Sequence, residues 1–195
     1  MAKAKRAVKQ EKIHASKVSS FSDGLRYPWG VPKRLWNILW ALIPFIGWLA
    51  LVSYSQSIIR AMVAGNKTSL PEFIGFGEHL RKGFLLFVKS LPLLIAYSLI
   101  FSVPGIGGVA GFIAFAFFLP YLMINLFVTD RFEESFNIPK VWDNVFSNLR
   151  EYLIAYVKTI GFVLVYGVLS IILIGIPCLQ FGCLFFLVEF YTNHN

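Results

Sequence analysis

Two lysines lie inside long apolar runs of the sequence, where an ammonium group needs a specific partner. Lys89 and Lys158 are each the only charged residue in their run. Such a lysine can keep its stem in lipid and extend its charge to the headgroups. Alternatively, the two form a paired site for lipid phosphate or another anionic ligand. Arg81 and Arg150, which precede the two runs, are further candidate contacts for such a group.

Several polar side chains also fall within apolar segments, and we expect them to form an intramembrane polar cluster. Hydrogen bonds between helices explain most such residues in membranes, and a path for a polar substrate is the alternative. The central segments 84–102, 107–128 and 152–174 contain no Asp, Glu or His. Ion-coupled transporters place ionisable groups near the membrane midplane, so the sequence disfavours that activity. The candidate cluster residues are Asn37, Gln56, Tyr97, Asn125 and Tyr166.

No set of residues matches a catalytic or metal-binding pattern. The three histidines are scattered, and Cys178 and Cys183 are five positions apart, a spacing that fits neither a redox pair nor a zinc site. The sequence contains no nucleophile elbow and no glycine-rich phosphate loop. We therefore expect a protein that is not an enzyme and that uses no cofactor and no metal.

The composition indicates which elements must hold these residues. Hydrophobic residues make up 57% of the 195 positions and charged residues 14%, whereas soluble domains have roughly 45–50% and about 25%. The mean hydropathy is +0.67. A soluble domain of this size cannot hide so much apolar surface, which excludes a soluble enzyme or a disordered chain. The predicted fold class is an all-α polytopic membrane bundle.

Proline and glycine divide the apolar runs into helical hairpins. Breaks at 102–108 and 174–177 separate pairs of helices long enough to cross a bilayer. Amphipathic stripes rich in Phe and Trp precede each pair and predict helices that lie along the membrane surface. The predicted transmembrane helices are 84–102, 107–128, 152–174 and 178–192, and the predicted interfacial helices are 71–83 and 139–150.

The two hairpins resemble an internal repeat with a spacing of 69 residues. Leu80-Arg81 matches Leu149-Arg150, Val88-Lys89 matches Val157-Lys158, and Tyr97 matches Tyr166. Repeats of this length are common in membrane folds.

Gly107 and Gly111 add a small-residue face, which favours a packing seam within the fold, with homodimerisation as the alternative.

The charge of +8 predicts the orientation. The breaks at 102–108 and 174–177 contain no Lys or Arg. Seven Lys and Arg residues lie in the segments 60–82 and 129–151, so these segments should be cytoplasmic. The basic tail, residues 1–20, should be disordered and cytoplasmic too, which conflicts with a single crossing at 35–59. We therefore favour a re-entrant hairpin with its tip at Pro44–Gly47 over a kinked span. This places both termini of the single membrane domain, 21–193, in the cytoplasm.

The order of several motifs resembles a known family. The chain is similar to the prokaryotic integral-membrane family catalogued as domain of unknown function 4013, over roughly residues 20–193. It departs from the family at Ser53, where glycine is common. The resemblance implies a class and a prokaryotic origin, but no activity. The motifs are Tyr27-Pro28, Ile43-Pro44-Phe45-Ile46-Gly47, Tyr54 followed by Arg60, Gly65, Leu70-Pro71-Glu72-Phe73 and Lys82-Gly83.

These observations predict a multi-pass protein of the cell membrane with a non-catalytic, membrane-organising or accessory role. The alternative is a small uncoupled transporter of a lipid or another apolar solute. The expected partners are the bilayer, anionic headgroups at the basic tail, and a protein that the sequence does not identify. No specific nucleic-acid binding is expected, because no aromatic residue stands among the charges before Phe21.

Overall fold

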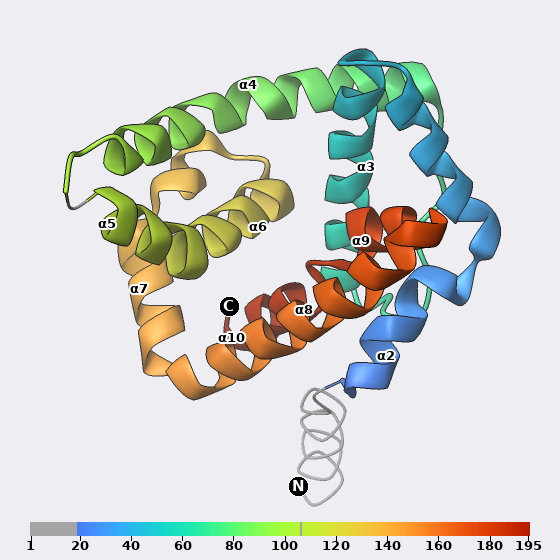
Figure 1. Ribbon diagram of the computed structural model, residues 1–195. Helices are drawn as coiled ribbons and strands as arrows, with labels where there is room; N and C mark the ends of the chain where they lie inside the picture. The colour runs from blue at the N-terminus through green and yellow to red at the C-terminus, as the bar shows by residue number, and fades with distance from the viewer. Residues whose placement is uncertain (1–18, 106) are drawn as a thin grey trace, which may run out of the picture.

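The computed structural model describes residues 19–105 and 107–195, and its described secondary structure is entirely helical (Figure 1). The predicted all-α class is confirmed. The prediction of a disordered tail falls almost wholly on residues outside the described part. Within the described residues, five helical segments are long and apolar enough to cross a membrane: Ile46–Val63, Phe76–Phe101, Gly107–Thr129, Leu149–Ile172 and Gly175–His194.

The amino-terminal elements form a hairpin. The short helices α2 (Phe21–Arg26) and η1 (Tyr27–Gly30) lead into η2 (Pro32–Leu42), and α3 (Ile46–Val63) follows. Phe45 takes a left-handed φ of 64° at the turn between η2 and α3. The predicted tip at Pro44–Gly47 therefore coincides with a turn, but α3 continues to Val63 and is by itself long enough to span. The re-entrant path stays a prediction.

The loop after α3 is held by contacts with the hairpin. Leu70 is fully buried, and its carbonyl oxygen accepts a hydrogen bond from Arg34. The Tyr54 hydroxyl donates to the Pro71 carbonyl at 2.8 Å. The Phe73 ring stacks on Trp40 and meets the Tyr54 ring edge-on. Since each backbone or ring partner comes from η2 or α3, the Leu-Pro-Glu-Phe segment fastens the loop across that hairpin.

Helix α4 (Phe76–Phe101) differs from the prediction at its start. Residues 71–75 are not helical, and α4 runs from Phe76 through the predicted boundary at 83–84 without a break. The predicted separate helix 71–83 is therefore wrong, because the lone Gly83 between the charged and the apolar turns does not interrupt the helix. Pro92 lies inside α4 without ending it. Gly83 packs directly against the Leu49 carbonyl oxygen, which brings α4 onto α3.

The return half of the first hairpin is one continuous helical segment with a widened turn. It comprises α5 (Gly107–Ile113), the π-helical turn η3 (Ala114–Phe118) and α6 (Leu119–Thr129). A π turn frees a backbone carbonyl from the regular ladder. Tyr152 from α8 satisfies one such group by donating to the Ala116 carbonyl at 2.6 Å.

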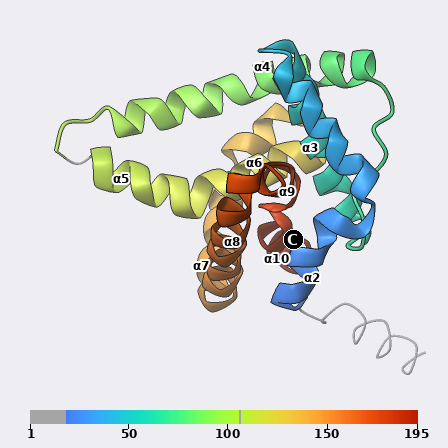
Figure 2. The same ribbon diagram turned by 45° about the vertical axis from the view of Figure 1, so that its right-hand side comes forward.

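The second hairpin begins after η4 (Phe132–Phe136) and α7 (Ile138–Ser147). Helix α8 (Leu149–Leu169) and η5 (Ser170–Ile172) precede the turn, and α9 (Gly175–Gly182) and α10 (Phe185–His194) return. The interfacial helix predicted at 139–150 ends earlier, where Asn148 separates α7 from α8, and the predicted helix 178–192 is divided into α9 and α10. In Figures 1 and 2 the α4–α5 turn projects from the rest of the molecule, far from the α8–α9 turn.

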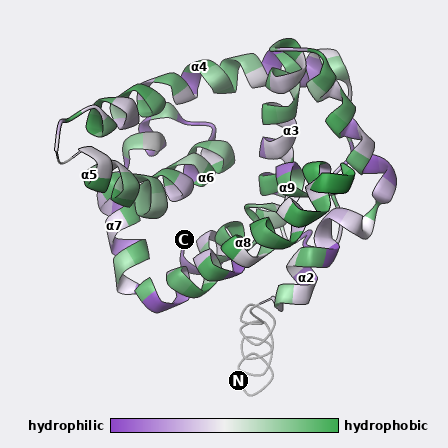
Figure 3. Ribbon diagram, viewed as in Figure 1, coloured by the Kyte–Doolittle hydropathy of each residue, from purple (hydrophilic) through white to green (hydrophobic). Residues whose placement is uncertain are grey.

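The outer helices differ from the inner ones in burial. In the most apolar windows of α4 and α8, 17% of the residues are buried, against 56% for α3 and 67% for α9–α10. Figure 3 shows that α4 and α8 consist mostly of hydrophobic residues, and many of these side chains are exposed. Apolar surface that faces outward over two whole helices is typical of contact with lipid or with another membrane protein.

Candidate functional site

The two predicted lysine sites have different surroundings. Lys89 donates to the Asp130 carboxylate at 2.8 Å and to its carbonyl at 2.9 Å, just beyond the end of α6. Lys158 donates to the Ser19 carbonyl at 2.9 Å and lies over the Phe186 ring at 5.5 Å from its centre. The structure therefore does not bring the lysines together as a pair. Arg81 and Arg150 are exposed on α4 and α8.

The five residues of the predicted polar cluster are also distributed over the molecule. Asn125 is fully buried and Gln56 nearly so, and both bond groups near the end of α6 or the loop after it. Asn37 lies beside the Tyr54 hydroxyl. Tyr97 packs near Phe115 in the first hairpin.

Tyr166 lies in the second hairpin and accepts a hydrogen bond from Trp29 Nε1 at 2.8 Å. The prediction of one cluster is therefore not met, because the helices point these side chains toward different neighbours.

A buried polar network does exist, around Asn125. Its amide donates to the Glu134 carbonyl at 2.7 Å and carboxylate at 3.1 Å, while its oxygen accepts from the Tyr191 hydroxyl at 2.8 Å. Asn137 also donates to Glu134, and Lys140 lies 4.0 Å from it. These hydrogen bonds lower the pKa of Glu134. The network joins α6 to α10. Sequence reasoning named Asn125 but missed its partners, because Tyr191 is 66 positions away and the Glu134 contact depends on how the chain folds back after α6.

A second polar group forms around Glu189, the one acidic residue in an apolar segment. Glu189 is 5% exposed, and its Oε1 accepts from the Ser19 backbone and hydroxyl at 2.8 and 2.6 Å. Lys67 completes the ion pair at 3.2 Å. A buried carboxylate needs such partners to remain charged. The arrangement binds the start of the described chain and the α3–α4 loop to α10.

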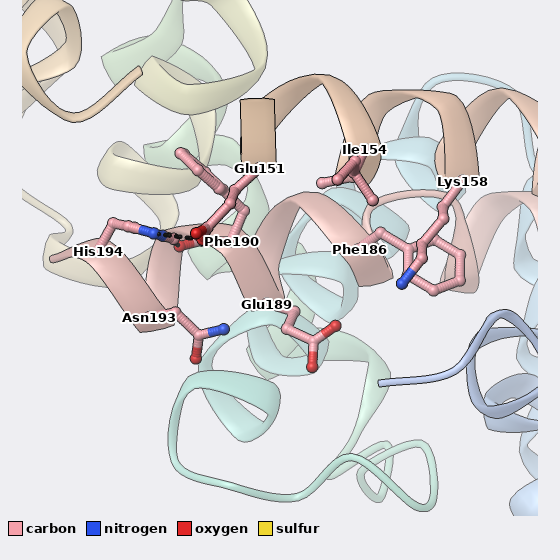
Figure 4. Close-up of a pocket in the computed structure, with 9 residues that line it drawn as sticks. Glu151, Ile154, Lys158, Phe186, Glu189, Phe190, Asn193 and His194 are labelled. Atoms are coloured by element: carbon pink, nitrogen blue, oxygen red, sulfur yellow. Dashed lines mark hydrogen bonds and ion pairs between the residues drawn. The ribbon is translucent and has the colours of Figure 1, made fainter. Parts of the chain in front are cut away.

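The small cavity beside Glu189 is lined by ionisable groups from α8 and α10 (Figure 4). His194 Nε2 lies 2.8 Å from Glu151 Oε2, and Lys158 and Asn193 line the same space. The volume is about 80 Å³, which is enough for no more than a few waters. Among the described residues, no three His, Cys, Asp or Glu side chains are placed to hold a metal ion.

One Ser–His pair has the residue types of a nucleophile and a base. Ser53 Oγ lies 3.1 Å from His79 Nδ1, and both residues are buried. The His79 ring packs on Phe73 with 4.3 Å between centres and meets Tyr54 edge-on. The pair thus lies within the packed contact of α3 with α4, where it joins the two helices.

Two larger cavities are almost entirely apolar. One, of about 450 Å³, lies between α4 and the segment α5–α6 and contains Tyr97. The other, of about 520 Å³, lies among α3, α8, α9 and α10, with Ser55 and Gln180 in its lining. Both volumes fall within the range of small-molecule sites, roughly 300–1,000 Å³. Neither cavity holds Asn125 or Tyr166, so the residues expected to line a transport path do not share a space.

A family model described as Protein of unknown function (DUF4013) matches residues 37–175. The chain belongs to this family. No curated protein and no solved structure matches the chain. The predicted DUF4013 resemblance is thereby confirmed, although the matched range is narrower than the predicted 20–193.

The structure explains the DUF4013 motifs in this chain as supports of the amino-terminal η2–α3 hairpin. Ile43–Gly47 forms the turn before α3, and Leu70–Phe73 is held by hydrogen bonds and ring contacts from η2 and α3. Gly83 allows the close approach of α4 to α3. The motif residues therefore position helices, and none of them lines the three cavities described above.

Proposed function

We propose that this DUF4013 protein is a non-catalytic membrane protein that organises or supports a partner assembly in the cell membrane. The observation that carries the proposal is the pattern of burial: α4 and α8 expose apolar faces, while most of the buried polar side chains bond other groups of the chain. Such a molecule offers a large lipid-compatible surface and little polar interior through which a solute could pass.

The proposed orientation has both termini in the cytoplasm. Crossings by α4, α5–α6, α8 and α9–α10 return the chain to its starting side, whereas a fifth crossing by α3 would put the termini on opposite sides. The positive charges of the two flanking segments support the first arrangement. The η2–α3 hairpin then enters and leaves from the cytoplasmic face and packs against α4, as non-spanning backbone in a membrane must.

A thiol-accessibility map tests this orientation. Single cysteines at positions 20, 45, 66, 102 and 135 are introduced into Cys178→Ala, Cys183→Ala protein and treated in intact cells with a membrane-impermeant reagent. We expect labelling from outside at 102 alone. Labelling at 20 would show that α3 crosses and would overturn the re-entrant path. The same reagent applied to inverted vesicles is the positive control for position 66.

The organising role is tested by the proteins that associate with the chain. Deletion of residues 1–18 removes basic charge and leaves Ser19, which bonds Glu189 and Lys158, in place. We expect crosslinking in native membranes to recover a partner set that changes on deletion, while the thermal midpoint of the purified protein is unchanged. The full-length chain with Lys158→Gln is the control for folding, because it loses the hydrogen bond to Ser19 but keeps the tail. An identical partner set from both chains would contradict the proposed role of the tail.

Uncoupled transport of a lipid or apolar solute is the second candidate. It is favoured by the cavity of about 520 Å³ among α3, α8, α9 and α10. Proteoliposomes with fluorescent phospholipid in both leaflets test it. In protein-free vesicles, a quencher added from outside removes the fluorescence of the outer leaflet, about half of the total. If the protein moves lipid between the leaflets, the quencher removes more than half. Equal quenching with and without the protein would remove this candidate.

A further inference from the structure

The first hairpin contains a void, open to the surface, that its own side chains do not fill. Helix α4 packs along α5 near the turn and makes fewer contacts with α6, and η4 closes the far end. The void between them measures about 450 Å³. Leu93 and Ile100 line it from α4, Ala114 and Leu122 from the return segment, and Phe136 from the loop. Tyr97 supplies the one phenol in an otherwise apolar lining.

The equivalent region of the second hairpin is filled by the chain itself. Trp29 donates to Tyr166, the counterpart of Tyr97, and the Tyr166 hydroxyl donates to the Leu25 carbonyl. Phe21 stacks on Phe186 with 5.9 Å between ring centres. The segment Phe21–Gly30 thus occupies the second hairpin, and no described segment does so at Tyr97.

A cation, Lys89, lies on α4 one helical turn before Leu93, the first of the lining residues along the chain. Lys89, Leu93 and Ile100 stand four and eleven positions apart, so they share one face of α4. Two N–H groups of the Lys89 ammonium donate to Asp130. Because an ammonium has three N–H groups, one is left to donate to another acceptor. Because Asp130 follows the last turn of α6, Lys89 lies level with the end of a spanning segment, where lipid headgroups are found.

We propose that this void binds one acyl chain of a membrane phospholipid, whose phosphate contacts Lys89. The void is continuous with the exposed apolar surface of Ile100 and Ile113, which line it, so surrounding lipid reaches it directly. A polypeptide is a poor occupant: a helix about 10 Å wide would fit for only about four residues. An extended segment would find only the Tyr97 hydroxyl as a hydrogen-bond partner for its backbone N–H and C=O groups. The proposal rests on the proposed membrane-embedded role.

Photolabelling of the full chain in lipid vesicles tests the site. The probe is a phosphatidylglycerol with a diazirine on one acyl chain, and mass spectrometry maps the labelled residues. We expect labels concentrated on the void lining around Tyr97. Ala96→Phe, which fills the void, should lower that labelling at least fivefold. Leu99→Phe places the same ring on the exposed face of α4 and should leave it unchanged.

The contribution of the phosphate is tested with a second pair of variants. Lys89→Gln should lower labelling by the phospholipid at least threefold and leave labelling by a diazirine fatty alcohol unchanged, and Lys89→Arg should restore it. Lys158→Gln, at the equivalent place on α8, should have no effect. Equal effects of Lys89→Gln on both probes would overturn the phosphate contact.

Three outcomes would overturn the acyl site. One is uniform labelling over α4 and α8 that Ala96→Phe leaves unchanged. The second is a crosslink between two copies at Tyr97, which would assign the void to a second chain. The third is extraction of the protein by alkaline carbonate, which would overturn the membrane-embedded function as well. A chain that resists carbonate but labels uniformly overturns the acyl site alone.

Discussion

The two hairpins have the same outline and different interiors. Each has an exposed outer helix with a lysine, a turn with Pro and Gly in it or directly after it, and a more buried return segment. In the second, the amino-terminal segment fills the space beside Tyr166, and 67% of the return window is buried. In the first, the space beside Tyr97 is a cavity, and the corresponding value is 44%. Similar sequences therefore form one hairpin that is closed at its tyrosine and one that is open there, because only the second receives the amino-terminal cover.

The largest expected effect concerns the polar network that both hairpins share. Asn125→Ala should lower the free energy of unfolding by about 2–3 kcal/mol, because it leaves the buried Tyr191 hydroxyl and the partly exposed Glu134 carboxylate without their partner. Denaturant titration in detergent measures the change. Asn193→Ala, on the exposed face of α10, is the control and should be nearly neutral. Equal stability of the two variants would show that the network does not join the hairpins.

Packing within the closed hairpin should have the next largest effect. A methyl group at Gly182 would clash with the Phe162 ring and approach Pro28, whereas Gly167 has open space. Gly182→Ala should therefore cost about 1–3 kcal/mol, and Gly167→Ala should stabilise by about 0.5–1 kcal/mol. Thermal unfolding in detergent compares them. A stabilising Gly182→Ala would mean that the amino-terminal cover packs loosely.

The hydroxyl groups of the repeated tyrosines separate the hairpins directly. Tyr166→Phe removes the acceptor of Trp29 and should cost about 1–2 kcal/mol. Tyr97→Phe should change stability by less than about 0.5 kcal/mol, because its hydroxyl is next to an apolar void. The ratio of the two losses, measured in the same detergent, is the test. Similar losses would remove the distinction between a closed and an open hairpin.

The smallest expected effect is a pH dependence from Glu134 in the loop after the first hairpin. Its pKa is lowered in the folded chain by hydrogen bonds from Asn125 and Asn137, with Lys140 and Arg131 nearby. Its stabilising contribution is therefore complete above the unfolded pKa, about 4.3, and is lost as the pH falls through the lower folded value. Unfolding between pH 7 and pH 3 measures it. Glu134→Gln should reduce the loss of stability between pH 7 and pH 3. Glu133→Gln, which changes an exposed neighbour, should leave that loss unchanged.

The sequence predicted the helical breaks better than the helix starts. Proline–glycine clusters carry local information, so the turn at 102–105 falls within the predicted break 102–108. The second turn, at 173–174, only meets the edge of the predicted break 174–177, because Gly175 and Pro177 already belong to α9. The starts of α4 and α8 do not agree with prediction, because amphipathic charge alone does not end a helix. The prediction of one polar cluster failed for a related reason: helix rotation and tilt decide whether Gln56, Tyr97 and Tyr166 meet, and no short-range pattern encodes them.

The sequence by itself determined the class of this protein: an all-α membrane bundle of the DUF4013 family, since hydropathy and breakers act locally along the chain. Only the tertiary structure decided that Lys89 and Lys158 have unlike partners, that Glu189 is neutralised by Lys67, and that one hairpin is left open. Those features depend on which distant segment packs where. The position of Phe21–Gly30 against one hairpin rather than the other is a property of the assembled core.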